Sequence, residues 1–346
     1  MKLWQRFLCR HLISTFLFFL VSIFLVYVIV DLSAHGALFL SSETTTFADI
    51  GLYYLRNFSR HLELFFPLTL LLTVLKVLLD LNIHQELVAL QMGGLSKKRI
   101  LRPFFLFASF LALLSYANSE WLSPDARDAA QAFRKAHGKK QSRKKSLYTL
   151  ALRDNSELIY HSFDEGKLFD VFWVCSIDDI WHIKFLKIGT PPQGSYVDHL
   201  QRNPQGLLEK TESFVAHTFP QMLWDESAIL ARFVPFEHRP LSTLFAQATS
   251  STAERYKALS HLHYKLALPM LHFLLICALA PASMHFTRRR PAFLIVTLSL
   301  AGLIALMTIL NGMLILGETQ VVPASFAIWG PLVALFLWTV PRFAKL

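Results

Sequence analysis

The chain has 346 residues, of which 53% are hydrophobic and 17% are charged, and its mean hydropathy is +0.40. Soluble domains are about 45–50% apolar and about 25% charged, so this composition excludes both an ordinary soluble protein and a disordered one. The net charge of +10 would suit nucleic-acid binding if the basic residues formed one surface, but many of them lie in short loops between apolar segments.

Six apolar segments are long enough to cross a membrane, which takes about 20 residues. Three precede a long polar stretch and three follow it: Leu12–Val30, Leu64–Leu81, Pro103–Ser119, Leu266–Phe286, Ala292–Leu316 and Val321–Val340. The first segment follows basic residues, as a signal peptide does, but it is long and has no small-residue cleavage site before Asp31. We therefore predict a membrane α-helical fold with six transmembrane helices, arranged three plus three.

The Lys and Arg residues of the short loops fall on one side of this arrangement. That side carries Lys2, Arg6, Arg10, Lys97, Lys98, Arg99, Arg102, Arg288, Arg289, Arg290, Arg342 and Lys345. The opposite short loops carry only Arg56 and Arg60. The positive-inside rule then places both termini in the cytoplasm and the long polar stretch outside it. Much of the positive charge is thus a topology signal, and we expect no nucleic-acid partner.

The loop at residues 82–99, NIHQELVALQMGGLSKKR, is too polar to span a membrane. Good helix formers at Gln85–Met92 predict a short cytoplasmic helix with Glu86 in its first turn and an apolar side made of Leu87, Val88 and Leu90. Gly93 and Gly94 would end this helix, and Ser96 would cap the next one. The helix either is a plain connector or docks on a cytoplasmic partner. In the preceding span, Lys76 either reaches the membrane surface or pairs with Asp80.

The long stretch changes from helical to strand-like alternation after Leu147. Turn-forming pairs at residues 154–155, 165–166 and 178–179 separate the expected strands. These are Leu147–Arg153, Glu157–Phe163, Phe169–Ile177, Ile180–Ile188, Ser195–Leu200, Leu207–Phe219 and Ala228–Phe233. The domains are therefore expected at residues 1–123 (helices and the cytoplasmic segment), 124–260 (an inserted all-β domain with short flanking helices such as Asp125–His137) and 261–346 (helices).

Three interpretations of the β-domain stay open: a cap on the membrane part, an open edge for a partner strand, or a sheet that holds acyl chains. The basic run Lys139–Lys145 is either a linker or a contact for anionic head groups. His261 and His263 suit a membrane interface better than a metal site, which needs clustered ligands. Cys9, Cys175 and Cys277 lack the paired spacing of a disulfide framework or a zinc site.

No Walker A, GxGxxG or HExxH pattern occurs, so the chain carries no ATPase, dinucleotide-binding or zincin motif of its own. We expect no catalytic residue, no metal and no cofactor in this chain.

Residues 86–96, ELVALQMGGLS, resemble the coupling helix of the LptF/LptG (YjgP/YjgQ) permeases, the membrane subunits of the lipopolysaccharide export ABC transporter. Three further segments are similar to that family: FFP at 65–67, NSEWLSP at 118–124 and YKLALP at 264–269. Their order within the three-plus-β-plus-three layout extends the resemblance over essentially the whole chain.

The resemblance implies a permease subunit of the bacterial inner membrane, without enzyme activity, that extracts lipopolysaccharide and passes it to a periplasmic β-jellyroll bridge. The inserted domain would be one such jellyroll in the periplasm. The implied partners are an LptB-like ATPase dimer that binds the ATP, a second LptF/LptG-type permease, LptC/LptA-like jellyroll proteins, lipopolysaccharide and membrane lipids. An exporter of another lipid and a membrane-anchored β-domain scaffold or sensor remain as alternatives.

The resemblance also implies site residues. Glu86, Leu87, Leu90, Gln91 and Gly94 would dock on the ATPase. The family's lysines after the first span are replaced here by DLSAHG at residues 31–36, so the nearest candidates for head-group phosphates are Arg56, Arg60 and Lys265. These three side chains are equally compatible with snorkelling to the interface. Whether the chain is LptF-like or LptG-like stays open.

Overall fold

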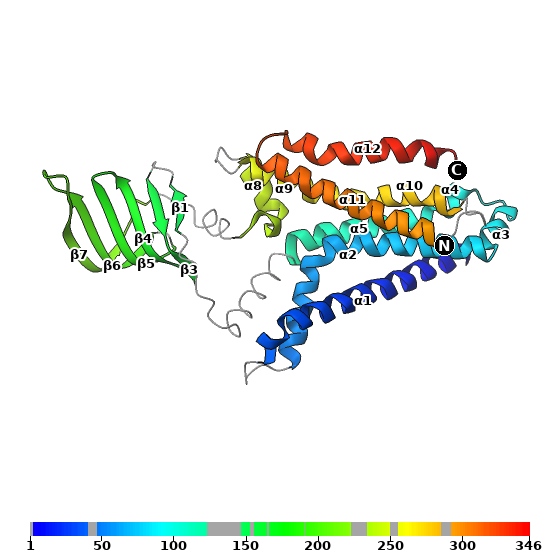
Figure 1. The fold of residues 1–346 in the computed structure, drawn as a ribbon, viewed down its shortest axis with the longest axis horizontal. Helices are drawn as coiled ribbons and strands as arrows, with labels where there is room; N and C mark the ends of the chain where they lie inside the picture. The colour runs from blue at the N-terminus through cyan, green and yellow to red at the C-terminus, as the bar shows by residue number, and fades with distance from the viewer. Residues whose placement is uncertain are drawn as a thin grey trace. The chain divides into compact units, whose positions relative to one another are not determined.

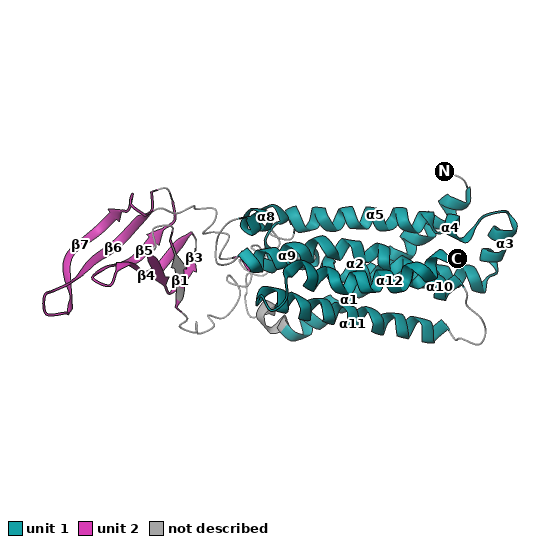
Figure 2. Cartoon of the chain, turned by 90° about the horizontal axis from the view of Figure 1, so that it is seen from above, with its two compact units in different colours: residues 1–139, 236–346 teal, residues 140–235 magenta. Residues whose placement is uncertain are grey.

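The computed structural model divides the chain into two compact units, residues 1–139 with 236–346 (unit 1) and residues 140–235 (unit 2) (Figure 2). It describes residues 3–40, 47–122, 147–152, 156–164, 166–189, 191–222, 234–249, 255–284 and 292–346. The expected helix Asp125–His137, the basic run Lys139–Lys145, the strand Ala228–Phe233 and Arg288–Arg290 lie outside these residues.

Unit 1 is a bundle of helices (Figure 1). Its elements are α1 Leu3–Leu40, α2 Phe47–Ile83, α3 Glu86–Met92, α4 Lys97–Ile100, α5 Arg102–Ala117, the π-helix η1 Asn118–Leu122, the 3-10 helix η2 Phe236–His238, α8 Leu241–Thr249, α9 Arg255–Ala267, the 3-10 helix η3 Leu268–Met270, α10 Leu271–Met284, α11 Ala292–Glu318 and α12 Ala324–Ala344.

Six helical stretches of the described residues are long and apolar enough to cross a membrane, which confirms the predicted three-plus-three arrangement. They are Leu3–Ala34, Ala48–Ile83, Lys97–Leu122, Arg255–Met284, Ala292–Glu318 and Ala324–Ala344. The second and fourth are much longer than the apolar runs in the sequence, because the helices continue through polar residues at one end. The fourth is a composite in which Pro269 sits in η3 between α9 and α10.

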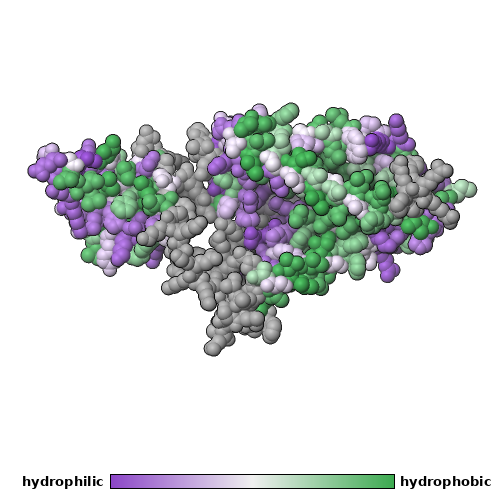
Figure 3. Space-filling view, in the orientation of Figure 1, coloured by the Kyte–Doolittle hydropathy of each residue, from purple (hydrophilic) through white to green (hydrophobic). Residues whose placement is uncertain are grey.

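α2 lies at the centre of unit 1 and contacts α1, α5, α10 and α11. In its most apolar stretch 72% of the residues are buried, against 6% in α1 and 17% in α11. Leu70, Val74 and Leu78 of α2 are completely buried, as are Ile276 of α10 and, almost completely, Phe104 of α5. Space-filling colours show a broad hydrophobic flank along the helices (Figure 3). α1 and α11 therefore direct most of their apolar surface away from this chain.

Unit 2 is one antiparallel sheet of seven strands within the described residues (Figure 1). The strands are β1 Tyr148–Ala151, β2 Glu157–Tyr160, β3 Ser162–Asp164, β4 Lys167–Ser176, β5 Asp179–Lys187, β6 Gln193–Arg202 and β7 Leu208–Thr218. Their order is β1-β2-β4-β5-β6-β7, and β3 pairs with β4. Six of the seven predicted strand segments thus contain strands. The segment 157–163 is split at His161, so that β2 and β3 pair with successive parts of β4.

The sheet has one apolar face. In register, Val171 of β4 stands opposite Ile183 of β5, and Ile183 opposite Val197 of β6; all three are completely buried. Phe219, which follows β7, covers this face near Gly194. A Cβ on Gly194 would lie 2.8 Å from the Phe219 ring, so the close approach requires glycine. Among the described residues β7 pairs only with β6, and most of its side chains are exposed.

Candidate functional site

The first candidate site is the short helix α3, at one end of unit 1 (Figure 1). α2 ends at Ile83, and Gln85 then adopts a φ of 62°, a left-handed conformation that redirects the chain into α3. Glu86 lies in the first turn, where the positive end of the helix dipole stabilises a carboxylate. The predicted helix and its start are confirmed to within one residue.

The end of α3 also follows the sequence. The Gly93 amide donates to Ala89, and Gly94 has a φ of 81°, which side-chain-bearing residues rarely adopt. Ser96 caps α4, because its hydroxyl accepts from the Arg99 amide at 3.4 Å. These turns set the direction in which α3 leaves the bundle.

α3 has one anchored side and one free side. Leu87 is 2% exposed and belongs to the core of unit 1, and Leu90 packs against that core. Glu86 and Val88 are exposed, and Met92 is 85% exposed. Leu87 therefore holds the helix to its own chain, and the surface offered to a partner consists of an acid flanked by apolar side chains. The sequence analysis missed Met92, although its place one turn from Val88 is the signal for it.

The same end of unit 1 carries other contacts between distant segments. Lys98 donates from Nζ to the carbonyl of Ala344 at 2.8 Å. Asn82 donates from Nδ2 to the carbonyl of Ser283 at 3.1 Å. Lys76 pairs with Asp80, Nζ to Oδ1 at 2.9 Å, which is one of the two alternatives that the sequence left open. The basic loop after α3 and the C-terminus therefore lie together.

The second candidate site is a cavity of about 410 Å³ near the other end of unit 1. Helices α2, η2, α9, η3 and α11 contribute its lining, which includes Arg60, Glu63, Glu237, His261, Lys265 and Asn311. Ionisable side chains in spanning helices are costly and are usually retained for function.

Most polar groups around this cavity have partners. Lys265 is 3% exposed and donates from Nζ to the carbonyl of Arg239 at 2.8 Å. His261 Nε2 lies 2.7 Å from Glu318 Oε1. Tyr264 donates its hydroxyl hydrogen to Asn311 Oδ1 at 3.0 Å.

The segment that follows unit 2 is fastened beside this cavity. The Arg239 guanidinium stacks on the Phe236 ring, with its carbon 3.6 Å from the ring centroid, and donates to Gln247 Oε1 at 2.7 Å. Glu120 of η1 accepts from the Ser242 hydroxyl at 2.5 Å and from the Ser242 amide at 3.1 Å, which caps α8. Nothing in the local sequence predicts this pairing across 122 residues.

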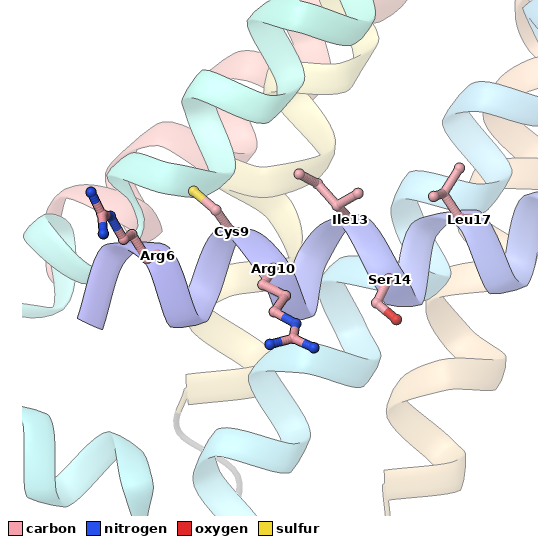
Figure 4. A pocket seen from close by; sticks show the side chains of 6 residues that line it. All are labelled: Arg6, Cys9, Arg10, Ile13, Ser14 and Leu17. Atoms are coloured by element: carbon pink, nitrogen blue, oxygen red, sulfur yellow. The ribbon is translucent and has the colours of Figure 1, made fainter. Parts of the chain in front are cut away.

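A third feature is an open groove of about 510 Å³ along one stripe of α1 (Figure 4). Its lining residues recur every three to four positions: Arg6, Cys9, Arg10, Ile13, Ser14 and Leu17. Figure 4 shows Cys9, Ile13 and Leu17 pointing to one side of the helix. The groove combines basic side chains at the start of a span with exposed apolar ones farther along.

The comparisons identify the family. The chain matches the lipopolysaccharide export system permease LptF/LptG over residues 6–345. It belongs to the LptF/LptG family. A comparison with curated proteins finds no match. The family consists of transport subunits for lipopolysaccharide export, and the six apolar helices with an inserted antiparallel sheet agree with a multi-pass permease of this kind.

For an LptF/LptG permease, the structure arranges the predicted site residues in a definite way. Those of the coupling helix are contiguous on α3 and its terminal turn. Arg60 and Lys265 line one cavity, whereas Arg56 is exposed on α2 outside that lining. The sequence analysis missed Glu63 and Glu237, which share the lining; a carboxylate at the edge of a span, such as Glu63, was itself a signal. The described residues contain no cluster of three or more His, Cys, Asp or Glu side chains that would hold a metal ion.

Proposed function

We propose that this LptF/LptG permease extracts lipopolysaccharide from the inner membrane and delivers it to a periplasmic β-jellyroll bridge, with the energy supplied by a separate cytoplasmic ATPase. The observation that carries the proposal is the exposed helix α3, with Glu86 in its first turn, between two spans of a chain that matches the family over residues 6–345. Moving several acyl chains out of a bilayer exposes apolar surface at about 25 cal/mol per Å², so the step needs an energy source and a protected path.

The coupling role belongs to α3. Its core-anchored Leu87 fixes the helix to the bundle, and Glu86, Val88 and Met92 offer a carboxylate and two apolar side chains to a groove on an LptB-like ATPase. In this arrangement Leu90, Gln91 and Gly94 shape the helix end beside the contact. Because ATPase closure must move the spans, rigid attachment of α3 to α2 favours transmission of force over a loose tether.

The orientation follows from charge. Lys97, Lys98 and Arg99 follow α3, and the contact between Lys98 and Ala344 brings the C-terminus to the same end. The positive-inside rule places this end, with both termini, in the cytoplasm and unit 2 in the periplasm.

Two surfaces suit the remaining protein partners. The mostly exposed apolar faces of α1 and α11 favour a second LptF/LptG-type permease, with the lipid between the two subunits. The exposed strand β7 suits edge addition by an LptC- or LptA-like jellyroll, which would continue the apolar face of the sheet. Arg56, Arg60 and Lys265 are the proposed contacts of the lipopolysaccharide head group.

A pull-down of the tagged chain in mild detergent, with mass spectrometry of proteins and lipids, tests this proposal. We expect an ATPase, a second six-span permease and lipopolysaccharide. Glu86→Arg should abolish ATPase recovery, because it reverses the only charge on α3. Glu157→Arg makes the same change at an exposed position of β2 and should leave recovery intact. Recovery of the chain alone after cross-linking would contradict the transporter and favour a scaffold.

A further inference from the structure

The cavity between α2, η2 and α9 is lined by charges of both signs. Arg60 and Lys265 supply positive charge, and Glu63 and Glu237 supply negative charge. Glu63 and Glu237 both lie within electrostatic reach of Lys265. A site built for bare phosphate alone would gain nothing from two carboxylates beside its cations.

The hydrogen bonds leave one donor and one acceptor unused. The Arg60 guanidinium donates from Nη1 to Asn57 Oδ1 at 3.2 Å, but its Nε is buried without a hydrogen-bond partner. Glu237 on η2 is exposed and forms no hydrogen bond or ion pair with the described residues. Buried donors are normally satisfied, so an unpaired guanidinium nitrogen points to a missing acceptor. Glu63, by contrast, accepts from the Ser119 hydroxyl at 3.3 Å.

Part of the lining is apolar. Leu64, which is 52% exposed, lies in the lining with Met307 and Leu314 of α11. The volume of about 410 Å³ is within the usual range for small-molecule sites, about 300–1,000 Å³. Charged groups of both signs beside apolar side chains are what an amphiphile with a zwitterionic head group requires.

We infer that this cavity binds a lipid head group that carries a phosphate and a primary ammonium group together. The phosphate accepts hydrogen bonds from Arg60, and the ammonium group donates to Glu237. Two sources supply this chemistry: phosphatidylethanolamine, and lipopolysaccharide whose lipid A phosphates carry phosphoethanolamine. If the bound head group belongs to lipopolysaccharide, the inference rests on the proposed function. The preference for a head group with both a phosphate and an ammonium group does not rest on it.

The test is lipid binding to the purified full-length protein in its complex, measured by native mass spectrometry. The probes are phosphatidylethanolamine, phosphatidylglycerol and phosphatidylcholine with identical acyl chains. We expect phosphatidylethanolamine to bind roughly tenfold more tightly than phosphatidylglycerol, because only it satisfies Glu237. Phosphatidylcholine should bind weakly, since its quaternary ammonium has no hydrogen to donate. Equal or tighter binding of phosphatidylglycerol to the unaltered protein overturns the inference.

Variants separate the two halves of the site. Glu237→Gln should remove the preference for phosphatidylethanolamine, and Arg60→Gln should weaken both phospholipids. Glu157→Gln and Lys257→Gln make matched changes at exposed positions outside the lining and should alter neither. A preference that persists in Glu237→Gln overturns the inference and leaves the carboxylates as neutralising partners of the cations.

A last comparison identifies which lipid class supplies the bound head group. Lipopolysaccharide with and without phosphoethanolamine is compared in the same assay; a preference for the modified form identifies lipopolysaccharide as a source, and equal binding of the two forms leaves phosphatidylethanolamine as the source. ATP-driven release of unmodified lipopolysaccharide is measured separately. Its loss would contradict the proposed transport while the head-group preference stands, so the two failures are distinguishable.

Discussion

At the scale of single residues, Glu120 shows how a side chain joins parts of the chain that are far apart in sequence. It stands in the π-helix η1 and accepts both hydrogen bonds that Ser242 donates at the start of α8. A carboxylate at this position satisfies an otherwise unpaired helix amide and interacts favourably with the helix dipole. The contact fastens the segment that follows the sheet to the third span.

We predict that Ser242→Ala lowers the stability of unit 1 by about 1 kcal/mol, because it removes the hydrogen bond that the Ser242 hydroxyl donates to Glu120. The measurement is the thermal unfolding midpoint in detergent. Ser33→Ala serves as the control, because the Ser33 hydroxyl bonds only to the carbonyl of Ile29 in its own helix. An equal midpoint for the two variants would show that this hydrogen bond contributes nothing.

Asp198 of β6 is a second residue with a clear electrostatic environment. Hydrogen bonds from Lys210 and then Ser213 lower the pKa of its carboxyl below the ordinary value, with oxygen distances of 2.7 Å and 2.6 Å. A carboxylate whose pKa is lower in the folded state stabilises the fold above its unfolded pKa, and this contribution is lost as the pH falls through the folded pKa. The side chain is partly exposed, so solvent screening keeps the contribution small.

We predict that Lys210→Met raises the pKa of Asp198 toward its ordinary value, because it removes the largest cause of the shift. Carbon-13 NMR of labelled aspartate carboxyls across a pH titration measures this. Lys184→Met changes a lysine of the neighbouring strand that stacks on Tyr196 instead, and should have less effect. An unchanged titration in Lys210→Met would refute the assignment.

At this scale, sequence reasoning reached some residues and missed others for a physical reason. Glu86, Ser96 and the pairing of Lys76 with Asp80 were predictable, because each depends on neighbours within one or two helical turns. Glu63 and Glu237 come together only when α2 and η2 pack, and no periodicity reports that. The return segment 236–249 is equally invisible, because its partners lie in η1 and α9.

At the scale of elements, the two glycines after α3 differ in what they require. Gly93 has a φ of −73°, which any residue adopts, whereas Gly94 has a φ of 81°. A side chain at Gly94 meets no neighbour, so its cost is backbone strain alone. The turn that ends α3 therefore depends on one glycine more than on the other.

We predict that Gly94→Ala weakens ATPase recovery in the pull-down more than Gly93→Ala does. Left-handed backbone costs a residue with a side chain about 1–2 kcal/mol, which is a factor of roughly 5–30 in an equilibrium. The chain relieves this strain by moving α3. Similar recovery for both variants would mean that the position of α3 does not depend on the turn.

The positions of the helices and strands along the chain were easier to predict than their packing. Apolar windows located all six spans and alternation located the strands, because both signals are local. Local signals cannot find strand partners, so the order of the sheet, with β7 at its edge among the described residues, emerged only from the structure. The separation of β2 from β3 arises at His161, whose amide bonds to the carbonyl of Phe169 at the junction.

At the scale of the whole molecule, burial is uneven between the spans. α2 is surrounded by its own chain, whereas α1 shows Val21 and Leu25 more than half exposed. A bilayer accommodates such faces, and the proposed second permease would cover part of them.

We predict that a photo-crosslinking residue at Leu25 captures a second LptF/LptG-type permease, detected by mass spectrometry of the cross-linked band. The same residue at Leu12, which is 1% exposed on α1, should capture no other protein. Capture of lipid alone at Leu25 would place the second permease elsewhere.

The contact between Asn82 and Ser283 joins residues 201 positions apart, and the buried face of α2 packs on α10, which is synthesised equally late. Ribosomes add about 5–20 residues per second, so roughly 10–40 s separate the two partners during synthesis. For that time the first three helices stay in the bilayer with the central face of α2 uncovered. During synthesis, lipid therefore has to cover this mainly apolar face of α2 until α10 arrives.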